Sequence, residues 1–305
     1  MSEQIQSLNE VVELEDQLTL VYQEPEEYFH YYSIYYGQKY ADYFFRRSLE
    51  VMKEVVSIFD CGYFIMHDEK IIGGVFIKPN FMADLFVAPP YKDYEGLVQK
   101  LLNHLKKISN TEEKMIVRDV VEKHVTSYEQ SGCQVNEVNY WMIRPTQPIK
   151  AILPGGYLSK PVLEENIADI VNLIMESYSA NSAYKQIGTK EDYTNHVREF
   201  IEIYQTNKIM DECSRVIVEQ CTNKIVGVCL HMEFENYPLI MSLAVHPEHQ
   251  HKGLGRFLLK HSINISSKEY PATRLSVIKG NPAIQLYEDL GFIKNKTLAD
   301  MYVVN

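Results

Sequence analysis

Two glycines stand in a short loop between an apolar stretch and a stretch with helical periodicity. Residues 239–245 have the length and composition of a buried strand, and Pro247 removes a backbone donor and ends it. Gly253 and Gly255 then let the backbone approach a ligand closely, just where helical spacing begins near Phe257. Free N–H groups and the dipole at a helix start favour anions, so the loop indicates a phosphate or pyrophosphate site. For a lone G-x-G, an ordinary strand-to-helix turn is the alternative.

The residues around this loop extend the pattern to two motifs in order. The segment resembles motif A of the GNAT superfamily of N-acetyltransferases, in which a strand leads through V-x-P and Q/R-x-x-G-x-G/A into a helix. The residues that carry this resemblance are Val245, Pro247, Gln250, Gly253 and Gly255. Residues 281–292 resemble motif B, N-x-x-A-x-x-L-Y-x-x-x-G-F. The resemblance is good over residues 156–305 and weak over the first half.

The resemblance implies acetyl-CoA as a cosubstrate and places its contacts. Backbone near the end of the strand is expected to hold the pantetheine and the thioester carbonyl, and amides of residues 250–256 are expected to hold the pyrophosphate. Asn281 would orient the pantetheine or a water molecule. The expected acetyl-CoA contacts are Leu243, Ala244, Val245, Gln250, His251, Lys252, Gly253, Leu254, Gly255, Arg256, Asn281 and Tyr287.

Tyr287 stands where the family places the tyrosine that donates a proton to the departing sulfur. The family transfers the acetyl group by direct attack of an amine in a ternary complex, without an acyl-enzyme. A phenol with a pKa of ~10 suits a thiolate of similar basicity. The alternative is a structural tyrosine on an amphipathic helix, and motif B favours the catalytic role.

The predicted strand at residues 225–235, which precedes the apolar run, carries the candidate general bases. Alternation places Cys229, His231, Glu233 and Glu235 on one face of residues 225–235, with apolar side chains on the other. His231 or Glu233 could take the amine's proton, directly or through water. Solvation of an edge strand explains the same alternation. By resemblance, residues 180–189 border the acceptor site, so Tyr184 is a candidate substrate contact.

Histidines and cysteines do not indicate a metal site. His246, His249 and His251 belong to the motif A neighbourhood, and no carboxylate or cysteine partner recurs at ligand spacing, so no metal is expected. The chain has five cysteines without a C-x-x-C, which argues for free thiols in a reducing compartment. The N-terminal residues lack a basic region with an apolar core, and no apolar run approaches the ~18 residues of a membrane span. We expect a cytoplasmic protein.

Length and charge limit the partners. With 305 residues, the chain is long enough for two domains, and 46% hydrophobic with 23% charged residues indicates a globular protein. The net charge of −11 argues against a nucleic-acid partner and against attraction to anionic membranes. A cationic amine suits this charge.

The first half looks like a degenerate copy of the second. Residues 95–104 align with residues 252–261, and residues 128–133 align with residues 287–292. In the first copy Asp93 replaces Gln250, Val98 replaces Gly255 and Glu122 replaces Asn281. The added carboxylate and β-branched side chain disfavour a pyrophosphate, so we expect this copy to serve packing or to shape a cleft. Residues 28–45, dense in tyrosine and phenylalanine, either line a substrate cleft or pack on a sheet; packing is favoured.

These observations predict an α/β (α+β) fold of two tandem GNAT-like domains. Each would be a mostly antiparallel mixed sheet flanked by helices and splayed at the acetyl-CoA site. The expected ranges are 1–148 for the degenerate domain and 149–305 for the catalytic domain, with helical stretches at residues 167–179 and 192–207 in the second.

The predicted function is acetyl-CoA-dependent N-acetyltransfer to a primary amine of a small molecule, amino acid or peptide. The alternative is a non-catalytic acyl-CoA-binding regulatory or interaction protein, because motif A specifies cofactor binding rather than turnover. The acceptor, the length of the acyl donor, and the choice between monomer and homodimer remain open at this point.

Overall fold

A computed structural model describes residues 11–41, 43, 47–184 and 188–304. The chain divides into two compact units. Unit 1 contains the described residues up to Asn139 and from Lys296 onward, and unit 2 contains Tyr140–Asn295.

Two long strands run from one unit into the other. Strand β7 (Cys133–Pro145) begins in unit 1 and ends in unit 2, whereas β13 (Ile293–Val303) begins in unit 2 and ends in unit 1. Residues 140–145 of β7, from the first half of the sequence, therefore belong to unit 2. Residues 296–303 of β13, from the second half, belong to unit 1. The predicted domain ranges, 1–148 and 149–305, are based on the sequence repeat and remain a prediction.

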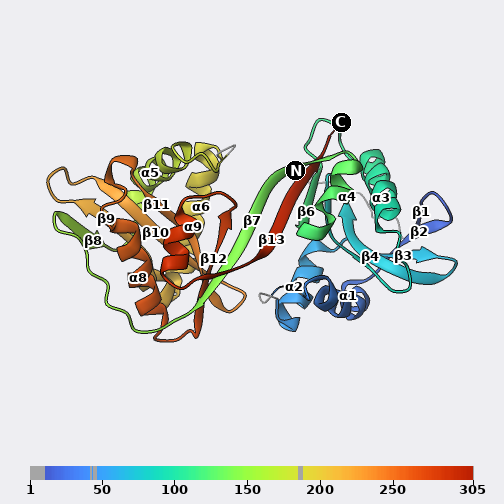
Figure 1. The fold of residues 1–305 in the computed structure, drawn as a ribbon, viewed down its shortest axis with the longest axis horizontal. Helices are drawn as coiled ribbons and strands as arrows, with labels where there is room; N and C mark the ends of the chain where they lie inside the picture. The colour runs from blue at the N-terminus through green and yellow to red at the C-terminus, as the bar shows by residue number, and fades with distance from the viewer. Residues whose placement is uncertain (1–10, 42, 44–46, 185–187, 305) are drawn as a thin grey trace. The chain divides into compact units, whose positions relative to one another are not determined.

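Unit 1 is a mostly antiparallel sheet with helices on both sides. Its strand order is β1-β2-β3-β4-β5-β6-β13, and β5 and β6 are the parallel pair. Helices α1 and α2 lie on one side of the sheet, and α3 and α4 lie on the other (Figure 1). The bounds are β1 (Val11–Glu13), β2 (Leu18–Tyr22), α1 (Pro25–Lys39), α2 (Leu49–Phe59), β3 (Gly62–His67), β4 (Lys70–Lys78), β5 (Phe81–Val87), α3 (Tyr94–Ile108), β6 (Ile116–Val121), η1 (Glu122–His124) and α4 (Val125–Gln130).

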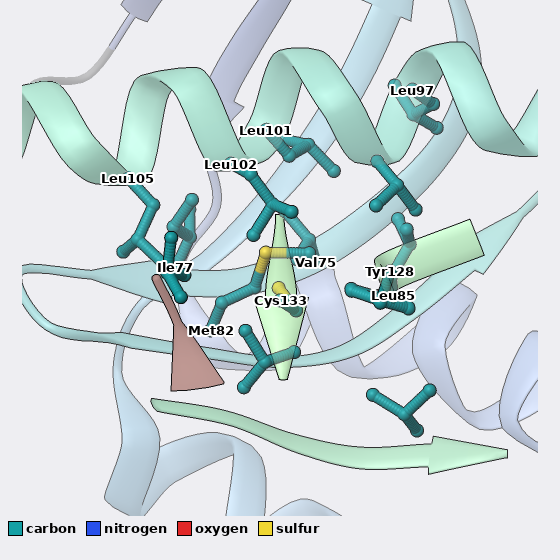
Figure 2. Close-up of a cluster of buried hydrophobic side chains, with 14 of the residues drawn as sticks. Val75, Ile77, Met82, Leu85, Leu97, Leu101, Leu102, Leu105, Tyr128 and Cys133 are labelled. Carbon is teal, nitrogen blue, oxygen red and sulfur yellow. The ribbon is translucent and has the colours of Figure 1, made fainter. Parts of the chain in front are cut away.

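Helix α3 forms because its apolar residues recur at helical spacing and meet the sheet. Its buried residues are Leu97, Val98, Leu101, Leu102 and Leu105. Figure 2 shows the leucines of α3 above side chains of β4 and β5, with Tyr128 and Cys133 in the same cluster. Each fully buried leucine contributes about 1.5–3 kcal/mol relative to an exposed one.

The tyrosines of α1 pack on the other face of this sheet. Tyr28, Tyr32 and Tyr36 recur every four residues and are buried. The Tyr28 ring lies 5.0 Å from that of Phe76 and 5.7 Å from that of Phe64, centroid to centroid. Of the two interpretations of the aromatic stretch, packing on the sheet fits these residues; residues 44–46 lie outside the described residues.

Unit 2 repeats the arrangement of unit 1. Its strand order is β7-β12-β11-β10-β9-β8, with α5 and α6 on one side and α8 and α9 on the other (Figure 1). The bounds are β8 (Tyr157–Lys160), η2 (Glu164–Asn166), α5 (Ile167–Ser179), α6 (Lys190–Glu202), η3 (Tyr204–Thr206), α7 (Lys208–Cys213), β9 (Arg215–Glu219), β10 (Ile225–Phe234), β11 (Tyr237–Val245), η4 (Pro247–His249), α8 (Leu254–Ser266), β12 (Ala272–Ile278) and α9 (Ala283–Asp289).

Strands β11 and β12 pair in parallel near their starts and then continue separately. The paired residues are Leu239 with Arg274 and Ile240 with Leu275, whereas the strands continue to Val245 and Ile278. Next to this point, β11 carries a bulge, because Leu230 faces Ser242 and His231 faces Ile240. The expected α/β architecture, mostly antiparallel mixed strands flanked by helices, is confirmed, with the described strands of both units hydrogen-bonded in one 13-stranded sheet.

The five cysteines are free thiols, as predicted, and Cys221 alone among them is exposed. In the part of the chain that the structure describes, no helix is both long and apolar enough to cross a membrane.

Candidate active site

The glycine loop presents the start of α8 without a side-chain cap. Gly253 is the N-cap residue with φ +85°, and His251 two residues earlier has φ +60°. Position 253 needs a glycine, because a residue with a side chain is strained at φ +85°. Consecutive amides in such turns converge on one point, so the loop can hold an anion as expected for a pyrophosphate.

Neighbouring side chains fix the loop in place. The Gln250 side-chain amide donates to the Val245 carbonyl at 3.1 Å and ties the loop to the end of β11. A Cβ on Gly255 would lie 3.4 Å from Leu286 Cδ2, so a larger side chain there would press on α9. Arg256 pairs with Asp289 of α9 at 2.9 Å. Lys252 is exposed and adds a positive charge near the loop.

The bulge in β11 sorts its side chains between the two faces. Leu243 and Val245 pack with α8 and α9, whereas Ala244 packs with α5 and α6. Met241 also packs on the α5 side, and Ser242 faces His196 of α6. The successive side chains of Met241 and Ser242 therefore both point to the face that α5 and α6 cover. The backbone at this bulge is the part of β11 that the separating strand β12 leaves open.

Tyr287 shares a buried cluster with Leu243 of β11 and Val277 of β12, the two strands that separate here. Its side chain is 7% exposed, and the groups that act on it electrostatically are Tyr178 and Cys229. Burial raises the pKa of Tyr287 above its ordinary value, with smaller contributions from those two neighbours. A phenol in this environment stays protonated at neutral pH and can donate to a developing thiolate.

Asn281 joins the start of α9 to the loop after α5. Its side-chain oxygen accepts from the Ala283 amide at 2.9 Å and from the Asn181 side-chain amide at 3.3 Å. The motif B asparagine thus has a structural task, since it holds the turn that carries Tyr287.

Tyr184, the expected substrate contact, is near enough to Tyr287 for that residue to raise its pKa. Its ring stacks on that of Tyr178, with centroids 4.5 Å apart and an interplanar angle of 9°. Tyr193 meets Tyr178 edge-on at 6.0 Å. Burial is the main cause that raises the pKa of Tyr184, and Tyr178 and Tyr287 act in the same direction. Residues 185–187 of this connection lie outside the described residues.

The two bases expected on β10 lie on the far side of the bulge from Val245. His231 faces Ile240 directly after the bulge, with its Nδ1 3.9 Å from Cys229 Sγ, and Glu233 faces Pro238 two residues farther along. The expected alternation does place Cys229 and His231 on the α8 face, opposite Val228 and Leu230.

The surroundings of His231 and Glu233 give them structural tasks. His231 is fully buried, contacts Ser262 at 2.5 Å through Nε2, and has its pKa lowered to about 3 by burial and by His261. Glu233 accepts from Tyr270 and Asn207 at 2.7 Å each. A base must reach the proton that it removes, and these side chains are already engaged elsewhere.

Three residues that sequence reasoning did not select join the site. Tyr178 ends α5, His196 lies on α6, and Ser242 lies on β11; the Ser242 hydroxyl is 3.4 Å from His196 Nε2 and also bonds Tyr178. Ser242 had a usable signal, because it is the one polar side chain in the apolar run 239–245. A polar side chain inside a buried strand needs a hydrogen-bond partner. For His196, the helical spacing gave no such signal.

The corresponding place in unit 1 is filled by the chain's own side chains. Asp93 caps α3 by accepting from the Gly96 amide at 2.9 Å, so a carboxylate occupies the anion position. Tyr94 stacks on His124 with centroids 3.7 Å apart, and its hydroxyl is 3.5 Å from that of Tyr128.

A buried carboxylate occupies the bulge of β5. The β4–β5 register shifts between Gly74 and Phe76, and Asp84 lies in this shift with φ +50°. Its carboxylate accepts from Lys39 and Tyr40 at 2.7 Å and from Tyr32 at 2.8 Å. Among the described residues, no three His, Cys, Asp or Glu side chains gather so as to hold a metal ion.

Comparison with known families gives a match over part of unit 2. Residues 212–294 match the acetyltransferase (GNAT) domain family. The chain carries a GNAT domain. The match spans the glycine loop, Asn281 and Tyr287, which are the features that the geometry brings together in unit 2. A search of curated protein sequences found no match.

Solved GNAT structures share the fold over 79–95% of the chain. A GCN5-related N-acetyltransferase from Sphaerobacter thermophilus superposes with a TM-score of 0.69 at 16% identity, covering 95% of this chain and 96% of that one. A GNAT-family acetyltransferase from Colwellia psychrerythraea gives 0.55 at 10% identity, over 94% and 99%. A tandem GNAT protein from the clavulanic acid biosynthesis pathway gives 0.51 at 13% identity, over 79% and 82%. The likeness includes both halves and shows a tandem GNAT fold.

Proposed function

We propose that this protein transfers an acetyl group from acetyl-CoA to a primary amine of a small molecule, an amino acid or a peptide. The observation that carries the proposal is the uncapped start of α8 beside the opening between β11 and β12, with Tyr287 in a buried cluster with residues of both strands. Support for acetyl-group chemistry comes from the GNAT domain match over residues 212–294.

The residues of unit 2 fit acetyl-CoA as a substrate. Amides of residues 251–256 and the exposed Lys252 would meet the pyrophosphate, and the glycines leave room for it. The open backbone of β11 near Leu243 would accept the pantetheine and the thioester carbonyl. Acetyl-CoA supplies the activated acetyl group, and the chain supplies orientation and proton transfer.

The proposed reaction needs one proton donor and one proton acceptor. The amine nitrogen bonds to the acetyl carbon, the carbon–sulfur bond breaks, and the sulfur takes the proton of the Tyr287 hydroxyl. The attack is direct within a ternary complex, so no residue of the chain carries the acetyl group. Tyr287 regains a proton from the nitrogen as the amide forms.

A binding and turnover experiment tests the proposal. Acetyl-CoA at about 100 times its dissociation constant should raise the free energy of unfolding by about 2.7 kcal/mol. Turnover is followed by thiol release with tyramine, spermidine, glucosamine, L-lysine and a lysine-containing peptide as acceptors. Binding with turnover supports an N-acetyltransferase. Binding without turnover on any acceptor would favour the non-catalytic acyl-CoA-binding alternative.

We also propose that unit 2 alone binds acetyl-CoA. In unit 1, Asp93 caps the helix that would bind the pyrophosphate, and Val98 is fully buried in the core. The Asp84 carboxylate and its partners fill the bulge that would meet the thioester. These contacts support a structural role for the first copy, including the shaping of acceptor contacts.

A further inference from the structure

The hydroxyl of Ser242 connects the opening at β11 with a histidine on α6. Ser242 directly follows the bulge and is 5% exposed. Its Oγ lies 3.4 Å from His196 Nε2 and also bonds the Tyr178 hydroxyl. Three elements, α5, α6 and β11, thus meet at one polar point inside an otherwise apolar cluster.

Local structure fixes His196 in this place. Helix α6 starts with a capping box, in which Thr189 and Asp192 each accept from the other's amide, at 2.7 and 3.1 Å. Val197 and Phe200 of the same helix are fully buried against the sheet. His196 is therefore held on a rigid helix, and its half-exposed ring borders both Ser242 and solvent.

The polar group formed by Ser242, His196 and Tyr178 lies next to the residues around Tyr287. Tyr178 stacks on Tyr184 and acts electrostatically on Tyr287, and Tyr287 in turn contributes to the raised pKa of Tyr184. An amine that enters beside Tyr184 and approaches the thioester near Leu243 would pass the Ser242 hydroxyl. Because amines are mostly ammonium ions at neutral pH, one proton must leave before the nitrogen can attack.

We propose that Ser242 and His196 form a relay that removes this proton. The inference rests on the proposed N-acetyltransferase function and gives that site its proton acceptor. The ammonium N–H bond breaks and its proton passes to Ser242 Oγ, while the Ser242 hydroxyl proton passes to His196 Nε2. The products are a neutral amine, an intact serine and an imidazolium, which returns its proton to solvent. His196 acts through Ser242, so it is a positioning residue that touches no reacting atom.

The charge state of His196 suits this task. Burial lowers the pKa of His196 below its ordinary value, and Glu199 of the same helix opposes the shift. Facing groups from the other packed elements are the neutral Tyr178 of α5 and Ser242 of β11. The imidazole is therefore uncharged at neutral pH and can accept a proton. Fully buried His231 has no comparable route to solvent.

The test compares the pH dependence of turnover in His196→Gln, Ser242→Ala and wild type. The acceptor is whichever of the five named amine probes gives the highest wild-type turnover, followed from about pH 5 to about pH 9. Wild type should lose kcat/KM as pH falls through the His196 pKa, below the ordinary value of ~6.5. His196→Gln should lose this acid limb and lower kcat by roughly 100-fold or more, with the KM for acetyl-CoA unchanged. Ser242→Ala should act in the same direction.

His104→Gln provides the matched control. His104 is half-buried on α3 in unit 1, and burial lowers its pKa also. This variant should keep the wild-type profile. NMR titration of the His196 ring in wild type and in Ser242→Ala reports the contact without turnover, and removal of the hydroxyl should shift that pKa.

The outcomes separate the relay from the function on which it rests. If wild type turns over an amine and His196→Gln keeps both its kcat and its acid limb, the relay is wrong and the N-acetyltransferase stands. An unchanged His196 pKa in Ser242→Ala would also contradict the relay. If wild type binds acetyl-CoA but acetylates none of the probes, the proposed function and the relay are both overturned.

Discussion

Burial, and not a charged neighbour, is the main reason that the Tyr287 hydroxyl stays protonated. Its pKa is raised chiefly because the surrounding chain excludes water, and the nearby groups are the neutral Tyr178 and Cys229. Tyr128, its counterpart in unit 1, is equally buried but has a partner, since its hydroxyl lies 3.5 Å from that of Tyr94. The two tyrosines occupy corresponding places in the repeat, so their different surroundings assign them different tasks.

Tyr287→Phe tests the donor role. Removing the hydroxyl should lower kcat by roughly 10²–10⁴ and leave the KM for acetyl-CoA nearly unchanged, because the proton matters chiefly as the sulfur leaves. The raised pKa also means that wild-type activity should not fall near pH 10 through ionisation of this residue. Steady-state kinetics with Tyr128→Phe as the matched control measures both. Wild-type turnover in Tyr287→Phe would remove this residue from the mechanism.

The Asp84 network gives a second residue-scale prediction. Burial alone would raise the pKa of Asp84, but Lys39, Arg47 and the hydrogen bonds from Lys39 and Tyr40 hold it well below its usual range. A depressed pKa contributes stability above the pKa of the unfolded chain, and this contribution is lost as pH falls through the folded value. Wild type should therefore keep the contribution at neutral and mildly acidic pH.

Asp84→Asn should destabilise unit 1 by about 3–5 kcal/mol, because it removes the buried carboxylate that pairs with the Lys39 ammonium at 2.7 Å. Urea unfolding at neutral pH measures this loss. The control is Asp16→Asn, which removes an exposed carboxylate that pairs with Lys100 at 3.1 Å and should cost under about 1 kcal/mol. Equal stability of the two variants would contradict the structural weight given to Asp84.

Candidate site residues can be named from the sequence where the signal is local, but not where their placement depends on distant packing. Gly253 and Tyr287 lie in motifs whose spacing is visible in the chain. The base could not be selected, because the burial of His231 depends on α8, whose Ser262 contacts it. Likewise, the bulge that turns Ser242 toward His196 depends on pairing between β10 and β11.

At the scale of elements, two helices with aligned sequences start in different ways. Helix α3 begins after Asp93, whose carboxylate accepts from the Gly96 amide, whereas α8 begins after Gly253 with no side-chain cap. The same helix dipole is thus neutralised by the protein in unit 1 and left for a ligand in unit 2. The sequence alignment predicted a carboxylate, Asp93, in place of Gln250, whereas its role as the cap of α3 is seen in the structure.

Gly255→Val tests the loop. Its added methyl groups would press on Leu286 and narrow the path of the pyrophosphate, so affinity for acetyl-CoA should fall by roughly tenfold to a hundredfold. Gly37→Val is the control, because Gly37 also lies in a helix and has no atom within 4 Å of its would-be Cβ. Calorimetric titration with acetyl-CoA measures both. Unchanged affinity in Gly255→Val would refute the assignment of the loop.

At the scale of the whole molecule, the repeat and the compact units do not have the same limits. The repeat is visible in the sequence because helices and loops align. The division of β7 and β13 between the units is not visible, because a strand has the same alternating pattern whichever sheet receives it. A cut in the expected link near residue 148 would therefore remove residues 140–145 from unit 2 and residues 296–303 from unit 1.

The single tryptophan makes this consequence measurable. Trp141 lies in the part of β7 that belongs to unit 2, where its ring stacks on Phe234 with centroids 6.1 Å apart and meets the Arg274 guanidinium at 5.9 Å. Fragment 1–148 carries Trp141, and fragment 149–305 carries Phe234. We expect each fragment alone to be less stable than the intact chain, because each lacks a strand of its unit. Mixing them should restore both sheets and shift the tryptophan emission to shorter wavelength as the ring leaves water. A 149–305 fragment with Phe234→Ala should give a smaller shift, and emission that stays unchanged on mixing the unaltered fragments would show that β7 does not complete unit 2.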